Sequence, residues 1–209
     1  MRLSFDTVAG LLASQPSHEN PADERTRAAV AMILRQCGGT EMLFIQRAAH
    51  YLDPWSGHLA FPGGKVEPGE EPRAAAERET GEEVGIDLGA ARYLGRLREI
   101  IGANLPVRVS CFVYGVNGCG VAMSSSDEVA DAFWVGMPDL SDPERHIIAP
   151  ARFHDRVFNV PAIRLPGPGL PVLWGITYRL VMQFLAALPE EVRPGLHFPA
   201  DDLHYGNSI

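Results

Sequence analysis

Hydrophobic and polar residues recur at two periods along the chain, and these periods predict strands flanked by helices. Apolar residues at helical spacing predict one helix over residues 3–14 and another over about 176–188. Runs rich in apolar residues predict strands at 27–34, 41–47, 91–100, 107–116 and 129–137, with a short strand at 57–61. The turn sequence Cys37-Gly38-Gly39-Thr40 joins the first two strands, so we expect a hairpin there.

A third helix is predicted where charged residues replace the apolar pattern. Pro72 suits the first turn of a helix, because its missing N–H would have no helical partner there. The run PRAAAERETGEEVG is rich in helix formers, and Gly85 suits a helix end. Strands, a polar helix, more strands and an apolar helix predict an α+β fold with a mixed sheet between helices.

Length and composition indicate one globular domain with short extensions. The chain has 209 residues, of which 46% are hydrophobic and 21% charged. We expect an N-terminal helix and linker at 1–25, the main domain at 26–188 and a tail at 189–209. The N-terminus predicts an amphipathic helix rather than a signal peptide, and no apolar run is long enough to span a membrane. We therefore expect a cytoplasmic protein with no membrane partner.

Charge and cysteine content limit the partners and the covalent chemistry. The formal net charge of -8 argues against non-specific binding of nucleic acid. An anionic substrate can still bind if a divalent metal supplies positive charge. Cys37, Cys111 and Cys119 are too few and too scattered for a disulfide framework and form no CxxC pair, so we expect three reduced thiols.

Three glutamates of the polar helix are the candidates for metal chemistry. Glu79, Glu82 and Glu83 lie at i, i+3 and i+4, so they project from one side of the helix. Their mutual repulsion calls for a positive partner, and Mg²⁺ prefers oxygen ligands of this kind. A metal there would neutralise phosphate oxygens and activate water. The alternative is a solvated acidic helix with internal pairs such as Arg78–Glu82.

The spacing around these glutamates resembles the Nudix signature G-x5-E-x7-R-E-U-x-E-E-x-G-U, where U is a bulky apolar residue. The seven fixed positions are filled by Gly64, Glu70, Arg78, Glu79, Glu82, Glu83 and Gly85. Ile86 fills the last apolar position, whereas Thr80 departs from the pattern at the other one. So many fixed residues at fixed spacing make a specific signal. The resemblance implies a Nudix-type α/β/α sandwich.

The resemblance also implies which residues hold the metal. Glu79, Glu82 and Glu83 would ligate one or more Mg²⁺ or Mn²⁺ ions, and the backbone carbonyl of Gly64 would add a ligand. Glu70 would help to tie the preceding loop to the helix and would reach the metal through water at most.

Catalytic roles are implied for a partly different set of residues. Arg78 would hold the loop and helix together, and Glu79 or Glu82 would act as the general base. Glu128, in a later loop, is the alternative base, and its other interpretation is an ordinary loop carboxylate before a strand. The implied reaction is attack of water on one phosphorus of a diphosphate, which needs positioning and charge stabilisation rather than a covalent nucleophile.

The segment LFIQRAAHYLDPWSGHLAFPGG, residues 43–64, resembles an element of the coenzyme A pyrophosphatases. That element reads roughly LLTxR-[SA], an arginine and then G-x3-F-P-G-G. Arg47 and Gly57 match, as does the stretch 61–64. The middle arginine is replaced by Leu52 or Asp53, and the spacing to the glycine is one residue longer.

Three residues of this segment are candidates for substrate binding. Arg47 can hold a phosphate by paired hydrogen bonds, or can be a solvated arginine at a strand end. Trp55 and His58 can form a wall for a base or a pantetheine arm. Phe61, by contrast, is expected to be a buried support of the loop, and Trp55 could be one as well.

The implied function is metal-dependent hydrolysis of coenzyme A or acyl-CoA to 3′,5′-ADP and (acyl-)phosphopantetheine. One alternative is a Nudix pyrophosphatase that acts on ADP-ribose, a dinucleotide or a nucleoside triphosphate. Another is a non-catalytic Nudix-fold binding module, although such modules commonly lose the glutamates that are present here. The expected partner is a small nucleotide rather than nucleic acid, and a homodimer is left open.

Overall fold

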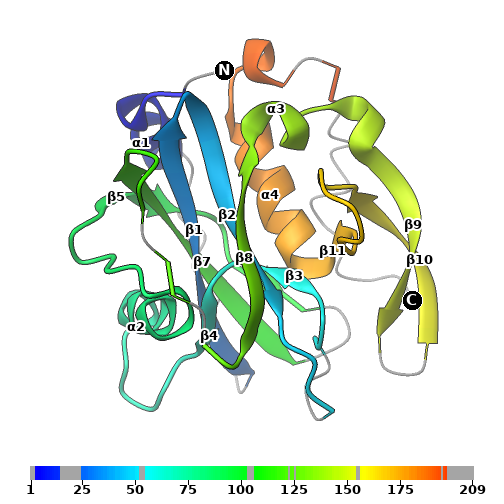
Figure 1. Ribbon diagram of the computed structural model, residues 1–209. Helices are drawn as coiled ribbons and strands as arrows, with labels where there is room; N and C mark the ends of the chain where they lie inside the picture. Colours follow the sequence, from blue (N-terminus) through cyan, green and yellow to red (C-terminus); the bar gives the residue numbers. More distant parts are fainter. Residues whose placement is uncertain are drawn as a thin grey trace.

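A mixed eight-stranded sheet forms the centre of the molecule (Figure 1). The computed structural model describes residues 3–14, 25–51, 55–102, 106–121, 123–124, 126–153, 156–193 and 195–196. Its elements, in chain order, are α1 (Phe5–Ala13), β1 (Thr26–Cys37), β2 (Gly39–Arg47), β3 (Leu59–Ala60), β4 (Gly63–Lys65), α2 (Pro72–Val84), β5 (Arg92–Arg96), β6 (Ile100–Ile101), β7 (Val107–Asn117), β8 (Val129–Gly136), α3 (Met137–Leu140), the 3₁₀ helix η1 (Pro143–Arg145), β9 (His146–Phe153), β10 (Arg156–Ile163), β11 (Leu173–Trp174), α4 (Gly175–Ala187) and the 3₁₀ helix η2 (Glu190–Val192).

The sheet is built around two long parallel strands, β1 and β7. Its order is β3-β2-β1-β7-β5, with β4 paired to β1, β6 to β7 and β8 to β2. The parallel pairing of β1 and β7 runs from Thr26 opposite Val107 to Gln36 opposite Asn117. The predicted hairpin is confirmed, since β1 and β2 pair antiparallel up to Cys37 opposite Gly39.

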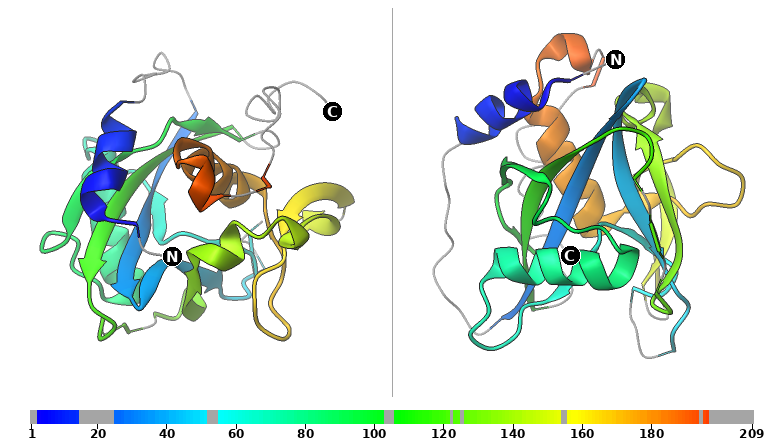
Figure 2. Two further views of the ribbon diagram at one scale, coloured as in Figure 1. Left: turned by 90° about the horizontal axis from the view of Figure 1, so that it is seen from above. Right: turned by 60° about the vertical axis from the view of Figure 1, so that its left-hand side comes forward.

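Helices cover both faces of this sheet, as Figure 2 shows, so the predicted α/β/α sandwich is confirmed. Side chains alternate between the faces of a strand. Ala31 and Ile33 of β1 therefore join the core beneath α2, whereas Met32 and Leu34 join the core shared by α1 and α4. The helix over 72–84 is confirmed and ends at Gly85, whose φ of 70° lies in the left-handed region that suits glycine.

A second, three-stranded antiparallel sheet in the order β11-β10-β9 was not predicted. In Figures 1 and 2, α4 lies between this sheet and the main one. Pro150 and Pro161 interrupt the apolar pattern of β9 and β10, and prolines weaken the evidence for a strand. The predicted strand over 91–100 is also divided, because residues 97–99 separate β5 from β6.

Cys37 and Cys119 form a disulfide, so the expectation of three reduced thiols is wrong for this pair. The parallel register of β1 and β7 explains it, because Gln36 lies opposite Asn117, Cys37 is the last residue of β1, and Cys119 comes two residues after the end of β7. Cys111 is a buried free thiol, and burial raises its pKa to about 12.

The chain ends are described only in part. The predicted N-terminal helix is confirmed as α1, which Ser4 caps by accepting a hydrogen bond from the Thr7 N–H. The expected linker and tail fall mostly on residues 15–24 and 197–209, which lie outside the described residues. Among the described helices, none combines the length and the hydropathy needed to cross a membrane.

Candidate active site

Helix α2 packs closely on the sheet because its inner face carries small residues. Ala75, Ala76 and Val84 of this helix are fully buried between the helix and the sheet. Thr80 is fully buried as well, and its hydroxyl donates to the Ala76 carbonyl at 2.7 Å. This internal hydrogen bond lets threonine occupy the position where the Nudix pattern has an apolar residue.

Glu83 is a buried carboxylate directed at the start of β4. Its side chain is nearly inaccessible, and the Gly63 N–H donates to its Oε2 at 2.8 Å. Arg47 Nη1 lies 3.9 Å from its Oε1. Burial raises the pKa of Glu83 to about 7, the Gly63 N–H and Arg47 oppose the rise, and the charges of Glu79 and Glu128 add to it. Two other carboxylates, Glu79 and Glu128, are therefore close enough to act on Glu83.

Glu79 lies directly against the backbone of Gly64. A Cβ atom at position 64 would be only 2.5 Å from the Glu79 Cδ and 2.6 Å from its Oε1. Only glycine leaves room for the carboxylate in this position. The Glu79 carboxylate thus lies against the residue whose carbonyl the resemblance implies as a further ligand, and carboxylate and carbonyl oxygens are donors that Mg²⁺ and Mn²⁺ prefer.

Arg78 connects the loop before α2 to the glutamates of the helix. Its Nε and Nη2 donate to the two oxygens of Glu70 at 3.0 and 3.1 Å, and Nη2 also donates to the Lys65 carbonyl at 3.3 Å. Nη1 donates to Glu79 at 2.9 Å and to Glu82 at 3.1 Å. The hydrogen bonds that Arg78 donates to Glu70 lower the pKa of Glu70 and raise the pKa of Arg78. This is the tie between loop and helix that the resemblance implies.

The three predicted metal ligands do not all reach the same place. Glu79 and Glu83 face β4, whereas the side chain of Glu82 is 60% exposed and pairs with Arg78. In the part of the chain that the structure describes, no three acidic, histidine or cysteine side chains are gathered as a metal cluster. The chemistry of these oxygen donors nevertheless fits a divalent cation, which Glu79, Glu82 and Glu83 would hold.

Glu128 lies near the buried end of this group. It is exposed, its charge contributes to the raised pKa of Glu83, and its backbone carbonyl accepts from the Ala48 N–H at 2.8 Å. The residues just before it contact the C-terminal end of α2, because the Ser126 N–H donates to the Glu83 carbonyl at 3.2 Å. The sequence suggested Glu128 as a base but did not predict this contact with the helix.

The predicted substrate segment is joined to the same group through Arg47. The Arg47 N–H donates to the His58 carbonyl at 3.0 Å, and the Gly57 N–H donates to the Arg47 carbonyl at 3.2 Å. The His58 ring lies 5.0 Å from the ring of Trp174, and its Nε2 is 3.2 Å from the Arg152 carbonyl. Sequence reasoning missed Trp174 and Arg152, because the second sheet that carries them was not predicted.

The other aromatic residues of the segment differ in burial. Phe61 is buried and stacks on Phe44 at 5.2 Å, which confirms its expected supporting position. Trp55 is half-buried, and its backbone carbonyl accepts from the His58 N–H at 3.0 Å. Leu52 and Asp53, which replace the middle arginine of the coenzyme A element, lie outside the described residues.

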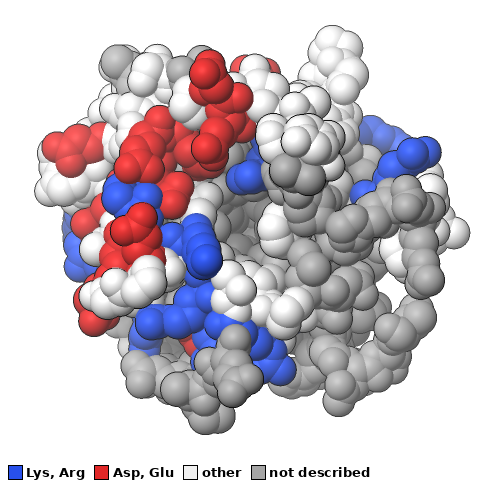
Figure 3. Space-filling view, turned by 90° about the horizontal axis from the view of Figure 1, so that it is seen from below, with Lys and Arg blue, Asp and Glu red and all other residues white. Residues whose placement is uncertain are grey.

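Charged side chains gather on one hollowed face of the molecule, where acidic and basic groups adjoin (Figure 3). A separate cavity of about 400 Å³ lies between residues 85–92 and the end of β7. None of the predicted site residues lines it. The candidate site is therefore defined by the charged groups along α2 and β4 rather than by this cavity.

Fold and site together define a class: a mixed sheet between helices, with a glutamate-bearing helix packed on a Gly-Gly strand. The NUDIX domain model matches residues 25–157, and the chain belongs to the Nudix family.

Individual proteins are similar to the chain over much of its length. "Nudix hydrolase 3" of Caenorhabditis elegans is 26% identical over 137 residues, which cover 62% of this chain and 57% of that protein. "Probable nudix hydrolase C6G9.05" of Schizosaccharomyces pombe is 27% identical over 174 residues, covering 80% and 58%. The chain thus spans somewhat over half the length of these relatives. A MutT/nudix family protein from Enterococcus faecalis shares the fold, with a TM-score of 0.54, 17% identity and coverage of 88% and 69%.

Proposed function

We propose that this protein hydrolyses a diphosphate bond in a nucleoside diphosphate derivative, with Mg²⁺ or Mn²⁺ as cofactor. The observation that carries the proposal is the Glu79 carboxylate held against Gly64, beside the buried Glu83. This arrangement occurs in a chain of the Nudix family, with all seven fixed residues of the signature present.

In the proposed mechanism, the protein places acidic groups around the diphosphate. Glu79, Glu82, Glu83 and the Gly64 carbonyl would hold the cation, which supplies positive charge for the phosphate oxygens when bound. Glu128 or one glutamate of α2 accepts a proton from the attacking water. The water oxygen forms a bond to one phosphorus while the bond from that phosphorus to the bridging oxygen breaks.

For the substrate, we propose coenzyme A or an acyl-CoA, cleaved to 3′,5′-ADP and (acyl-)phosphopantetheine. Support comes from the segment 43–64, because Arg47 lies beside Glu83 and is bonded through the backbone to His58. Arg47 can donate paired hydrogen bonds to a phosphate. His58, with Trp174 and Trp55, offers aromatic surface for a base or a pantetheine arm.

A second candidate is a pyrophosphatase that acts on ADP-ribose, a dinucleotide or a nucleoside triphosphate. It is favoured by the replacement of the middle arginine in the coenzyme A element by Leu52 or Asp53. A non-catalytic binding module is less well supported, because none of the glutamates of the Nudix signature is lost.

A mass-spectrometric substrate screen tests the proposal. The purified protein is incubated with coenzyme A, acetyl-CoA, ADP-ribose, a diadenosine polyphosphate and ATP, with Mg²⁺, Mn²⁺ or a chelator. We expect phosphopantetheine products that require the metal. Turnover of ADP-ribose without cleavage of either coenzyme A compound would reject the substrate, and no turnover of any compound with either metal would reject the activity.

A further inference from the structure

We propose that the Cys37–Cys119 disulfide is a redox modification site that positions the loop carrying Glu128 against α2. The loop is residues 118–128, of which the structure describes all except 122 and 125. Only the predicted effect on activity rests on the proposed function. The effect on the loop itself follows from its contacts.

The loop covers the C-terminal end of the glutamate-bearing helix. The Ser124 N–H donates to the Val84 carbonyl at 3.0 Å, and the Ser126 N–H donates to the Glu83 carbonyl at 3.2 Å. The last carbonyls of a helix lack partners within the helix, so the loop satisfies two of them. A Cβ at Gly85 would lie 2.3 Å from the Ser124 Oγ, which shows how closely loop and helix end approach.

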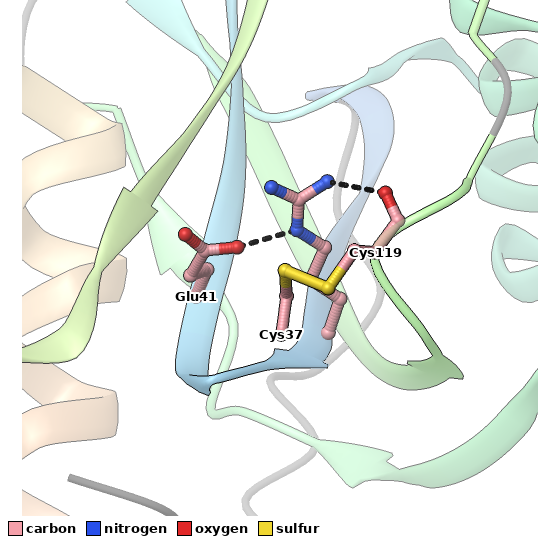
Figure 4. Close-up of a disulfide and its surroundings, with 4 residues drawn as sticks. Cys37, Glu41 and Cys119 are labelled. Atoms are coloured by element: carbon pink, nitrogen blue, oxygen red, sulfur yellow. Dashed lines mark hydrogen bonds and ion pairs between the residues drawn. A yellow bond between two sulfur atoms is a disulfide. The ribbon is translucent and has the colours of Figure 1, made fainter.

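The two ends of the loop are held in different ways. At the Glu128 end, the chain enters β8 and is fixed to β2 by the hydrogen bond from the Ala48 N–H. The other end of the loop follows β7, which ends at Asn117, and there the disulfide joins Cys119 to Cys37 at the end of β1 (Figure 4). Beside the disulfide, Cys119 has a long hydrogen bond of 3.4 Å, which Arg35 Nη1 donates to its carbonyl. The covalent bond is therefore the main restraint at this end.

The disulfide is placed where a reductant can reach it. Cys119 is exposed and Cys37 is half-buried, in contrast to the fully buried Cys111. A dithiol reduces it by attack of one thiolate on a sulfur, which breaks the S–S bond and forms a mixed disulfide. The second thiol of the reagent displaces the remaining cysteine. Two electrons and two protons thus pass to Cys37 and Cys119, and the dithiol becomes a disulfide.

Reduction releases one end of the loop while the other end stays in the sheet. Ordering the backbone of even one residue changes an equilibrium by roughly tenfold. We therefore expect the Ser124 and Ser126 amides to exchange with solvent about tenfold faster in the reduced protein. The loop then holds the Glu83 and Val84 carbonyls less firmly, so the end of α2 that carries Glu83 is less well positioned and kcat falls while KM changes little.

Hydrogen exchange of the full chain, followed by mass spectrometry on peptides covering 118–128, tests the first step. Oxidised protein is compared with protein reduced by dithiothreitol and with the Cys37→Ser/Cys119→Ser double variant. Cys111→Ala is the matched control, since it removes a thiol but leaves the disulfide, and it should keep the response to dithiothreitol. We expect faster exchange in the reduced protein and in the double variant. Equal exchange in all states would overturn the proposal.

Steady-state kinetics on the substrate found in the screen tests the second step. We expect kcat about tenfold lower after reduction and in the double variant, with no response of the double variant to dithiothreitol. Faster exchange with unchanged kcat would overturn the link between the loop and Glu83. If no diphosphate compound is cleaved, the proposed function fails, and the exchange experiment still decides whether the disulfide positions the loop.

Discussion

At position 64, the absence of a side chain is what allows the Glu79 carboxylate to lie against the backbone. We predict that Gly64→Ala moves this carboxylate away, because the new Cβ would be 2.5 Å from Glu79 Cδ. The atoms that must move are at the end of the flexible Glu79 side chain, so the melting temperature should change little. Metal-dependent turnover, by contrast, should fall about tenfold or more.

The control for this change lies on the same helix. Gly81 has open space around it, so Gly81→Ala should keep turnover and stabilise the protein by about 0.5–1 kcal/mol, the cost of glycine within a helix. Kinetics and thermal unfolding of both variants provide the measurement. Equal turnover in the two variants would show that the contact between Gly64 and Glu79 is not needed.

Replacing the buried Glu83 by glutamine separates its charge from its structural role. The amide oxygen of Glu83→Gln can still accept the Gly63 N–H, so the fold should be retained. Loss of the charge should reduce metal-dependent hydrolysis by about a hundredfold or more. The exposed Glu82→Gln should also lose activity, whereas Glu71→Gln, an exposed change at the start of α2, should not. Full activity of chelator-treated Glu83→Gln protein would contradict a metal role.

Residues at fixed spacing could be predicted from the sequence, but their partners could not. The periodicity of a helix places Glu79, Glu82 and Glu83 on one side. Helical periodicity does not predict that Glu83 is buried against β4 while Glu82 is exposed, because burial depends on how α2 packs on the sheet. The ion pair of Arg47 with Glu83 likewise joins residues that only the fold brings together.

Among the elements, α1, α2, α4 and the long central strands were predictable because their patterns extend over many residues. β4, β6 and β11 have two or three residues each, too few for a period to be recognised. β9 and β10 contain prolines, which argue against strands in a sequence. The disulfide follows from the register of β1 and β7, and the sequence does not state which strands pair in parallel.

The junction of β11 and α4 supplies a prediction about recognition. Trp174 of β11 contacts His58, which directly precedes β3 of the main sheet. Stacking of a nucleotide base on an aromatic side chain contributes about 1–3 kcal/mol to binding. We expect Trp174→Leu to raise KM for nucleotide substrates about tenfold, with a smaller change in kcat. Trp134→Leu, a change on β8 beneath the α2 face, is the matched control. Equal KM values for Trp174→Leu and the wild type would refute recognition by this pair.

For the whole molecule, metal binding should be visible as stability. A ligand that binds only the folded state at about 100 times its Kd adds about 2.7 kcal/mol. For a chain of this size, that raises Tm by roughly 5–10 °C. We expect such a rise with Mg²⁺ or Mn²⁺ in differential scanning calorimetry, reversed by a chelator. The rise should be absent in Glu79→Gln/Glu83→Gln protein, and an equal rise in that variant would place the metal elsewhere.

The fold of the whole molecule extends beyond the part that identifies its family. The NUDIX domain model ends at residue 157, whereas β10, β11 and α4 continue to Ala187. Leu180, Val181 and Phe184 of α4 are buried in the core on one face of the main sheet. Residues 156–187, which carry these elements, are thus part of the same folded unit.

The three-stranded sheet has a consequence for protein engineering. On the proposed function, the groups that cleave the bond lie on α2, at β4 and in the loop that carries Glu128. The hairpin of β9 and β10 contacts the substrate segment instead, through the Arg152 carbonyl and His58. Exchanging this hairpin between homologous enzymes can therefore retune selectivity while the reacting groups are left untouched.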